Sequence, residues 1–135
     1  MTSKKKTRSK PAMAAAPADA RHRIFRMPFA KIYQALLNKV ERKQRTRAEL
    51  DRIIVWLTGY SAAELKKWNR SDDDLGAFID RAPAFNPAAE LIKGTVCGVR
   101  VEDVAEPSMR RVRQLDKLVD ELAQGRPMEK ILRSA

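Results

Sequence analysis

The sequence contains one cysteine, Cys97, which lies between Gly94 and Gly98 in an apolar stretch. Catalysis by a thiol requires a neighbouring base or another group that lowers the pKa of the thiol. The single histidine, His22, lies at the edge of a basic N-terminal segment and is a poor partner for Cys97. We therefore predict that Cys97 is a small buried hydrophobic residue, at a point where the glycines allow another element to approach the backbone closely.

Arg100, Glu102 and Asp103 form the densest group of charges in the segment that contains Cys97. Two carboxylates beside an arginine could bind a polar ligand or orient a metal ion. Adjacent side chains point to opposite faces of a strand, so a local ion pair, with Asp103 capping the turn toward Pro107, is the simpler interpretation. Residues 97, 100, 102 and 103 are nevertheless the candidate ligand site, and the sequence predicts no catalytic, metal-binding or cofactor-binding residues.

Basic side chains on two expected helices could contact a nucleic acid. Residues 51–70 have the size of a helix-turn-helix, with Gly59 in the turn. Side chains able to meet phosphates or base edges are Lys39, Arg42, Lys43, Lys66, Lys67 and Arg70. Helical hairpins with a glycine turn are common in all-α proteins, so a purely architectural hairpin is the alternative interpretation.

The elements that must position these residues are predicted from apolar residues at helical spacing, beginning with a helix over about 28–43. Two capping boxes, Thr46 to Glu49 and Ser61 to Glu64, predict the starts of the next two helices, and Gly59 fits a left-handed C-terminal cap between them. Acidic, Asn or Pro residues at 71–74, 86–87, 107 and 127 predict further helix starts. The helix beginning at 107 is expected to be the longest and to stop at Gly125.

The segment from Thr95 to Val104 is the least regular part of the sequence. Cys97, Val99 and Val101 alternate as in a short strand, but no second strand is evident, so we expect an extended crossing segment. The predicted fold is all-α: a single compact domain of about six to seven helices over residues 22–135, preceded by a disordered basic tail over residues 1–21.

The net charge of +11 is unevenly placed, because the positive excess lies entirely before Ala48 and the remainder of the chain is close to neutral. The lysine-rich tail is interpreted either as a nonspecific tether to nucleic acid or as a solubilising extension. No apolar run approaches the roughly 18–20 residues that a membrane span needs, so no membrane partner is expected. A lone cysteine fits a reducing compartment, and we expect a cytoplasmic protein.

Several blocks of the sequence together resemble a family of small bacterial proteins. The blocks run from Trp56 to Tyr60, Leu91 to Asp103, Leu115 to Leu122 and Met128 to Arg133. In this order they are similar to the domain of unknown function 2200 family, over about residues 22–133. The resemblance implies a small, single-domain, cytosolic bacterial protein, and it supplies no catalytic residues.

Three functions follow from these observations, in descending order. The first is a non-enzymatic interaction or regulatory module that presents one surface to a protein or small ligand, because neither a catalytic pair nor a cofactor loop is recognisable. The second is a nucleic-acid-binding protein that uses the hairpin and the basic N-terminal segment. The third is a small ligand-binding protein or enzyme centred on residues 97–103. Leftover apolar surface on the longest helix would also suit a homodimer.

Overall fold

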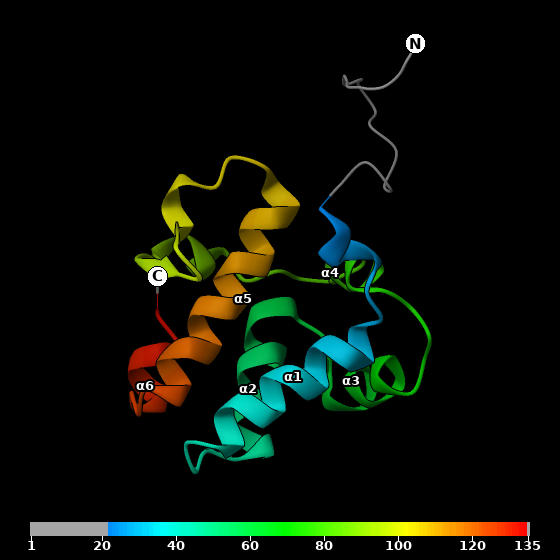
Figure 1. Ribbon diagram of the computed structural model, residues 1–135, viewed down its shortest axis with the longest axis horizontal. Helices are drawn as coiled ribbons and strands as arrows, with labels where there is room; N and C mark the ends of the chain where they lie inside the picture. The colour runs from blue at the N-terminus through cyan, green and yellow to red at the C-terminus, as the bar shows by residue number, and fades with distance from the viewer. Residues whose placement is uncertain (1–21, 135) are drawn as a thin grey trace.

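A computed structural model of the 135-residue chain describes residues 22–134, and Figure 1 shows their arrangement. The all-α prediction is confirmed, because the described residues form six α-helices and only a small sheet. The predicted tail over residues 1–21 lies outside the described residues. The helices are α1 (Phe29–Glu41), α2 (Arg47–Thr58), α3 (Ala62–Asn69), α4 (Leu75–Asp80), α5 (Pro107–Ala123) and α6 (Met128–Ile131). Three 3₁₀ helices, η3 (Arg23–Arg26), η4 (Pro87–Leu91) and η5 (Val101–Asp103), complete the helical elements.

Helix boundaries follow the local signals in the sequence. Both predicted capping boxes form, with the hydroxyls of Thr46 and Ser61 accepting from the backbone N–H groups of Glu49 and Glu64. Gly59 ends α2 with φ 81°, a left-handed conformation that glycine adopts without steric cost. The side chains of Asp74 and Asn86 cap α4 and η4 in the same way.

Aromatic residues from α1, α3 and α4 form the centre of one part of the core. The rings of Phe29 and Phe78 stack with centroids 3.9 Å apart, and Trp68 meets Phe78 edge-on at 5.3 Å. The Tyr60 hydroxyl donates a 2.7 Å hydrogen bond to the Phe78 carbonyl, and burial raises its pKa to about 12. The aromatic pair Trp56 and Tyr60 therefore belongs to the core, as its spacing predicts.

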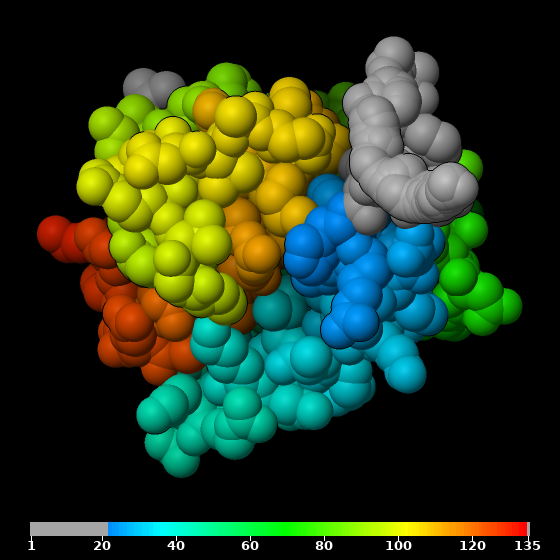
Figure 2. Space-filling model, turned by 45° about the horizontal axis from the view of Figure 1, so that its top comes forward, coloured from blue at the N-terminus to red at the C-terminus, as the bar shows by residue number. Residues whose placement is uncertain are grey.

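Helix α5 lies against most of the other elements of the molecule. It contacts α1, α2, α4 and α6, and its first half is covered by the segment that contains η4, the sheet and η5. In Figure 2 this segment, coloured yellow-green, lies over α5, coloured orange. No helix within residues 22–134 is long and apolar enough to cross a membrane.

The prediction of an extended crossing segment at 95–104 is wrong, because the segment folds back on itself. Strands β1 (Thr95–Val96) and β2 (Val99–Arg100) pair antiparallel, with Val96 opposite Val99. The two turn residues, Cys97 and Gly98, have φ of 52° and 76°, the pattern of the tight turns that join hairpin strands. Cys97 is exposed in this turn, so the prediction of a buried cysteine is also wrong.

Candidate functional site

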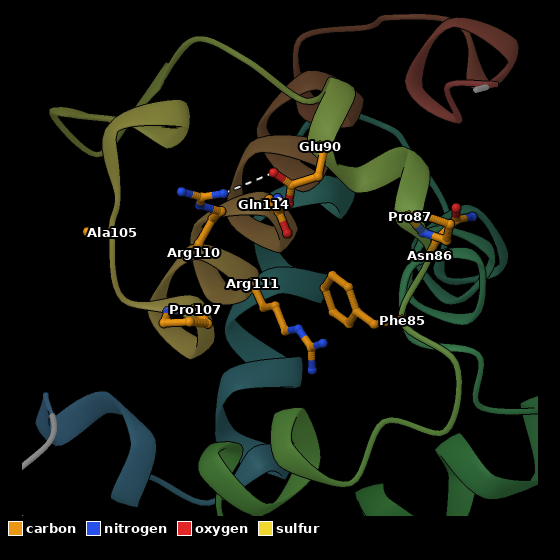
Figure 3. Close-up of a pocket in the computed structure, with 9 residues that line it drawn as sticks. All are labelled: Phe85, Asn86, Pro87, Glu90, Ala105, Pro107, Arg110, Arg111 and Gln114. Carbon is orange, nitrogen blue, oxygen red and sulfur yellow. Dashed lines mark hydrogen bonds and ion pairs between the residues drawn. The ribbon is translucent and has the colours of Figure 1, made fainter. Parts of the chain in front are cut away.

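A cavity of about 300 Å³ lies between η4 and the first two turns of α5. Figure 3 shows that its lining residues come from three segments: the approach to η4, the loop before α5, and α5 itself. They are Phe85, Asn86, Pro87, Glu90, Ala105, Pro107, Arg110, Arg111 and Gln114. A cavity of this size is at the lower end of the range for small-molecule sites, which typically combine apolar walls with a few polar groups.

Gln114 is the polar group buried most deeply in this lining, with 2% of the residue exposed. Its amide nitrogen donates to the Ala89 carbonyl and to Oε2 of Glu90, both at 3.2 Å. Its Oε1 atom is buried and has no hydrogen-bond partner. Reversing the amide would set Oε1 against two acceptors, so the orientation with the oxygen left over is the favourable one.

Arg111 packs its guanidinium over the Phe85 ring, with Cζ 4.3 Å from the ring centroid. This cation–π contact holds the group against the wall of the cavity. Its N–H groups have no hydrogen-bond or ion-pair partner within the described part of the chain. In Figure 3 the Arg111 and Phe85 side chains lie next to one another at the edge of the cavity. Arg111 therefore keeps hydrogen-bond donors and a positive charge for another group.

Arg110 differs from Arg111 because its donors are used inside the protein. Its Nε donates to the Val104 carbonyl at 2.8 Å, and its Nη1 pairs with Glu90 Oε1 at 2.9 Å. Figure 3 shows this ion pair bridging α5 and η4 across the cavity. Arg110 and Glu90 thus fix the two walls relative to each other and largely neutralise each other, and Arg111 remains as the uncompensated charge.

The residues predicted as a ligand site lie together, but on the surface of the hairpin. The Arg100 guanidinium pairs with Glu102 at 3.2 Å and with Asp103 at 3.8 Å, as the interpretation of a local ion pair requires. Glu102 also accepts a 3.0 Å hydrogen bond from the Gly94 N–H, which lowers the pKa of its carboxyl to about 2. This bond ties the two ends of the hairpin together. Cys97 lies at the tip of the turn.

The expected capping role of Asp103 is taken by another acid. Glu106 is the N-cap of α5, and its carboxylate accepts from the backbone N–H groups of Ser108 and Met109. Because the 3₁₀ turn of η5 ends at Asp103 itself, the chain must still cross residues 104–105 before α5 begins. Among residues 22–134, no three His, Cys, Asp or Glu side chains are placed to hold a metal ion.

The six predicted nucleic-acid contacts fall at two separate places. Phe29, at the first turn of α1, lies 6.5 Å from the Trp68 ring of α3, so α3 packs near the beginning of α1. Arg42 and Lys43 follow the last turn of α1, roughly 20 Å away at 1.5 Å per residue. Lys39 pairs with Asp120 of α5 at 3.3 Å. Lys66, Lys67 and Arg70 are exposed on α3 and at its C-cap.

The residues that line the cavity were missed in the sequence. Pro107, Arg110, Arg111 and Gln114 recur at helical spacing and share a face of α5, which is a signal that the sequence contains. The apolar face of the same helix, including Leu115 and Leu118, dominates the pattern. Phe85 and the η4 residues cannot be joined to that polar face without knowing how the elements pack.

Comparisons with known proteins agree with this geometry. The family model described as "Uncharacterized protein conserved in bacteria (DUF2200)" matches residues 23–133. A crystal structure of an uncharacterized protein, SP1917, is similar to the chain, with 38% sequence identity and a TM-score of 0.79. The similarity covers 84% of this chain and 93% of that chain. No curated protein matches.

Proposed function

The chain belongs to the DUF2200 family of proteins conserved in bacteria, as the sequence blocks predict, and from that starting point we propose that it is a small-ligand-binding module. The ligand would occupy the cavity between η4 and α5. This is a specific form of the interaction or regulatory module expected from the sequence. The cavity lining contains no nucleophile, and its one carboxylate, Glu90, is engaged with Arg110, so we propose binding without catalysis.

The observation that carries the proposal is the Oε1 atom of Gln114. A buried polar atom without a partner costs roughly 1–3 kcal/mol relative to a hydrogen-bonded one. Native proteins satisfy the large majority of such groups, so an exception that borders a cavity indicates a missing partner. A bound molecule with a hydrogen-bond donor would supply that partner.

The proposal is tested by filling the cavity from one of its own walls. Ala105 is an exposed residue of the lining, and Ala105→Phe would place a ring at the mouth of the cavity. We expect a library of small polar fragments to shift the backbone amide signals of residues 85–90 and 105–114 in ¹H–¹⁵N spectra of the wild-type protein. In the Ala105→Phe variant these shifts should disappear.

Ala35→Phe is the matched control, because Ala35 is exposed on α1 and outside the cavity lining. This variant should respond to the fragments as the wild type does. The proposal fails if no fragment shifts the two segments of the wild-type protein, or if Ala105→Phe leaves the shifts intact.

Nucleic-acid binding through α3 is a second candidate, favoured by the exposure of Lys66 and Lys67 on the second helix of the hairpin. The full-length protein and a variant lacking residues 1–20 would be titrated with duplex DNA at several salt concentrations. If α3 contributes, the shortened chain keeps part of the affinity, and Lys66→Ala with Lys67→Ala reduces the salt dependence. Loss of all binding on deletion would place the contact outside the folded region.

A further inference from the structure

We infer that the ligand of this cavity is a small carboxylic acid that also carries a hydroxyl or N–H donor close to the carboxylate. The inference rests on the proposed function and names the chemistry that the site would select. It follows from the two groups that the protein leaves without partners, the guanidinium of Arg111 and the amide oxygen of Gln114.

The amide oxygen of Gln114 defines the donor. Because the amide nitrogen is held by the Ala89 carbonyl and by Glu90, the side chain cannot turn to present an N–H instead. A carboxylate or ether placed beside Oε1 would leave two acceptors facing each other. Only a ligand group with an O–H or N–H satisfies this atom.

Arg111 defines the acid. A guanidinium remains charged at physiological pH and presents N–H donors in a planar fork that matches a carboxylate. The Phe85 ring supports one face of the group and restricts its motion, so little freedom is lost when an anion binds. With Arg110 already paired to Glu90, the lining has one positive charge left to neutralise.

The spacing of the two groups limits the size of the ligand. Arg111 and Gln114 are three residues apart on α5, which places their Cβ atoms about 5–6 Å apart on one face of the helix. An acid and a donor separated by one or two carbon atoms can reach both side chains. The rings of Phe85, Pro87 and Pro107 provide apolar walls for the remainder of a molecule that fits about 300 Å³.

The probes are 2-hydroxy acids with side chains of increasing size, from lactate to 3-phenyllactate, titrated by calorimetry and ¹H–¹⁵N spectroscopy. Each acid is compared with its primary amide, which lacks the carboxylate, and with its 2-deoxy acid, which lacks the donor. We expect at least one hydroxy acid to bind at residues 85–90 and 105–114, and both of its analogues to bind at least tenfold more weakly.

Two variants address the protein side of the same contacts. Arg111→Met keeps an apolar side chain beside Phe85 but removes the charge, and Gln114→Met removes the amide oxygen. Each should weaken the hydroxy acid at least tenfold, and Arg111→Met should no longer distinguish the acid from its amide. Arg42→Met is the matched control, since the turn after α1 lies near the opposite end of α5, where Arg45 donates to the Leu122 carbonyl. It should bind like the wild type.

The outcomes separate the ligand class from the proposed function. If the amide or the deoxy acid binds as well as the hydroxy acid, the inferred class is wrong, whereas the cavity still binds ligands. If no hydroxy acid binds but neutral fragments occupy the cavity, the class is again wrong and the binding function stands. If a hydroxy acid binds and both variants bind it unchanged, the site is wrongly placed. Because the ligand analogues test the class on the wild-type protein, a variant that fails to fold does not obscure the answer.

Discussion

Glu49 shows how one side chain can serve both a helix start and an ion pair. Its carboxylate accepts from the Thr46 backbone N–H at 2.9 Å and from the Arg45 guanidinium at 2.9 Å. The Arg45 guanidinium, with help from the Thr46 N–H, lowers the pKa of Glu49 from 4.5 to about 2. Since the folded-state pKa is the lower one, the stabilisation is fully present above pH 4.5 and is lost as the pH falls toward 2.

We expect Glu49→Gln to lower the free energy of unfolding at neutral pH and to have a shrinking effect below pH 4.5. Glutamine keeps the reach of the capping box but not the charge, so the variant isolates the ionised part of the interaction. Urea unfolding of both proteins between pH 7 and pH 2 measures the difference. A difference that stays constant down to pH 2 would show that the ionisation of Glu49 does not stabilise the fold.

Local interactions explain which single residues were predictable. The capping roles of Thr46, Ser61 and Asp74 depend on neighbours three residues away, so the sequence contains all the information that is needed. Cys97 could not be placed in this way. Its exposure depends on the turn of a two-residue hairpin, and cysteine is not one of the residues that favour the left-handed conformation found there.

At the scale of elements, the end of α2 is fitted closely against the loop before η4. Gly59 has φ 81°, and a Cβ atom built on it would lie 2.8 Å from atoms of Ala84. The loop is held there by backbone hydrogen bonds from Ala84 N to Thr58 O and from Asn86 N to Leu57 O. We therefore expect Gly59→Ala to destabilise the protein by about 2–3 kcal/mol, through both the backbone conformation and the contact.

Gly125 provides the matched comparison for Gly59. It follows α5 with φ 92°, and a Cβ atom there would meet nothing within 4 Å. Gly125→Ala should therefore cost only the conformational part, about 1 kcal/mol. Equal unfolding free energies for the two variants in urea would mean that the loop yields to the extra methyl group, which would contradict the close fit.

The helices were predictable from periodicity, and the segment between η4 and α5 was not. A helix makes its hydrogen bonds within one stretch of chain, so the spacing of apolar residues is sufficient to recognise α1, α2 and α5. Strands β1 and β2 contain two residues each, too few for alternation to be recognised. The short helix predicted after Asn86 forms, but as the 3₁₀ helix η4.

At the scale of the whole molecule, the cavity depends on packing between segments that the sequence does not relate. Phe85 and Glu90 reach Arg111 and Arg110 only because η4 docks on α5. The polar face of α5 is visible in the sequence, but the same spacing is typical of a solvated surface. What identifies the site is an unsatisfied buried atom, Oε1 of Gln114, which only the packed structure defines.

The C-terminal segment is joined to α5 through a buried carboxylate. Glu121 is 3% exposed, and Arg133 donates to its two oxygens at 2.6 and 2.8 Å. Arg126 adds a 3.2 Å contact to one of these oxygens but is itself 46% exposed at the side chain. A fork of two short bonds to a buried acid stabilises far more than a single contact at the surface.

We therefore expect the two arginines to differ strongly. Arg133→Ala should lower the free energy of unfolding by about 2–3 kcal/mol, because Glu121 would stay buried with only its exposed partner. Arg126→Ala should cost less than about 1 kcal/mol, since water can replace its contact. Urea unfolding gives both values, and hydrogen exchange at the amides of α6 shows whether that helix separates from α5 in Arg133→Ala. Similar losses in the two variants, or protection of α6 that does not change, would mean that apolar packing of Ile131 holds the C-terminal segment in place.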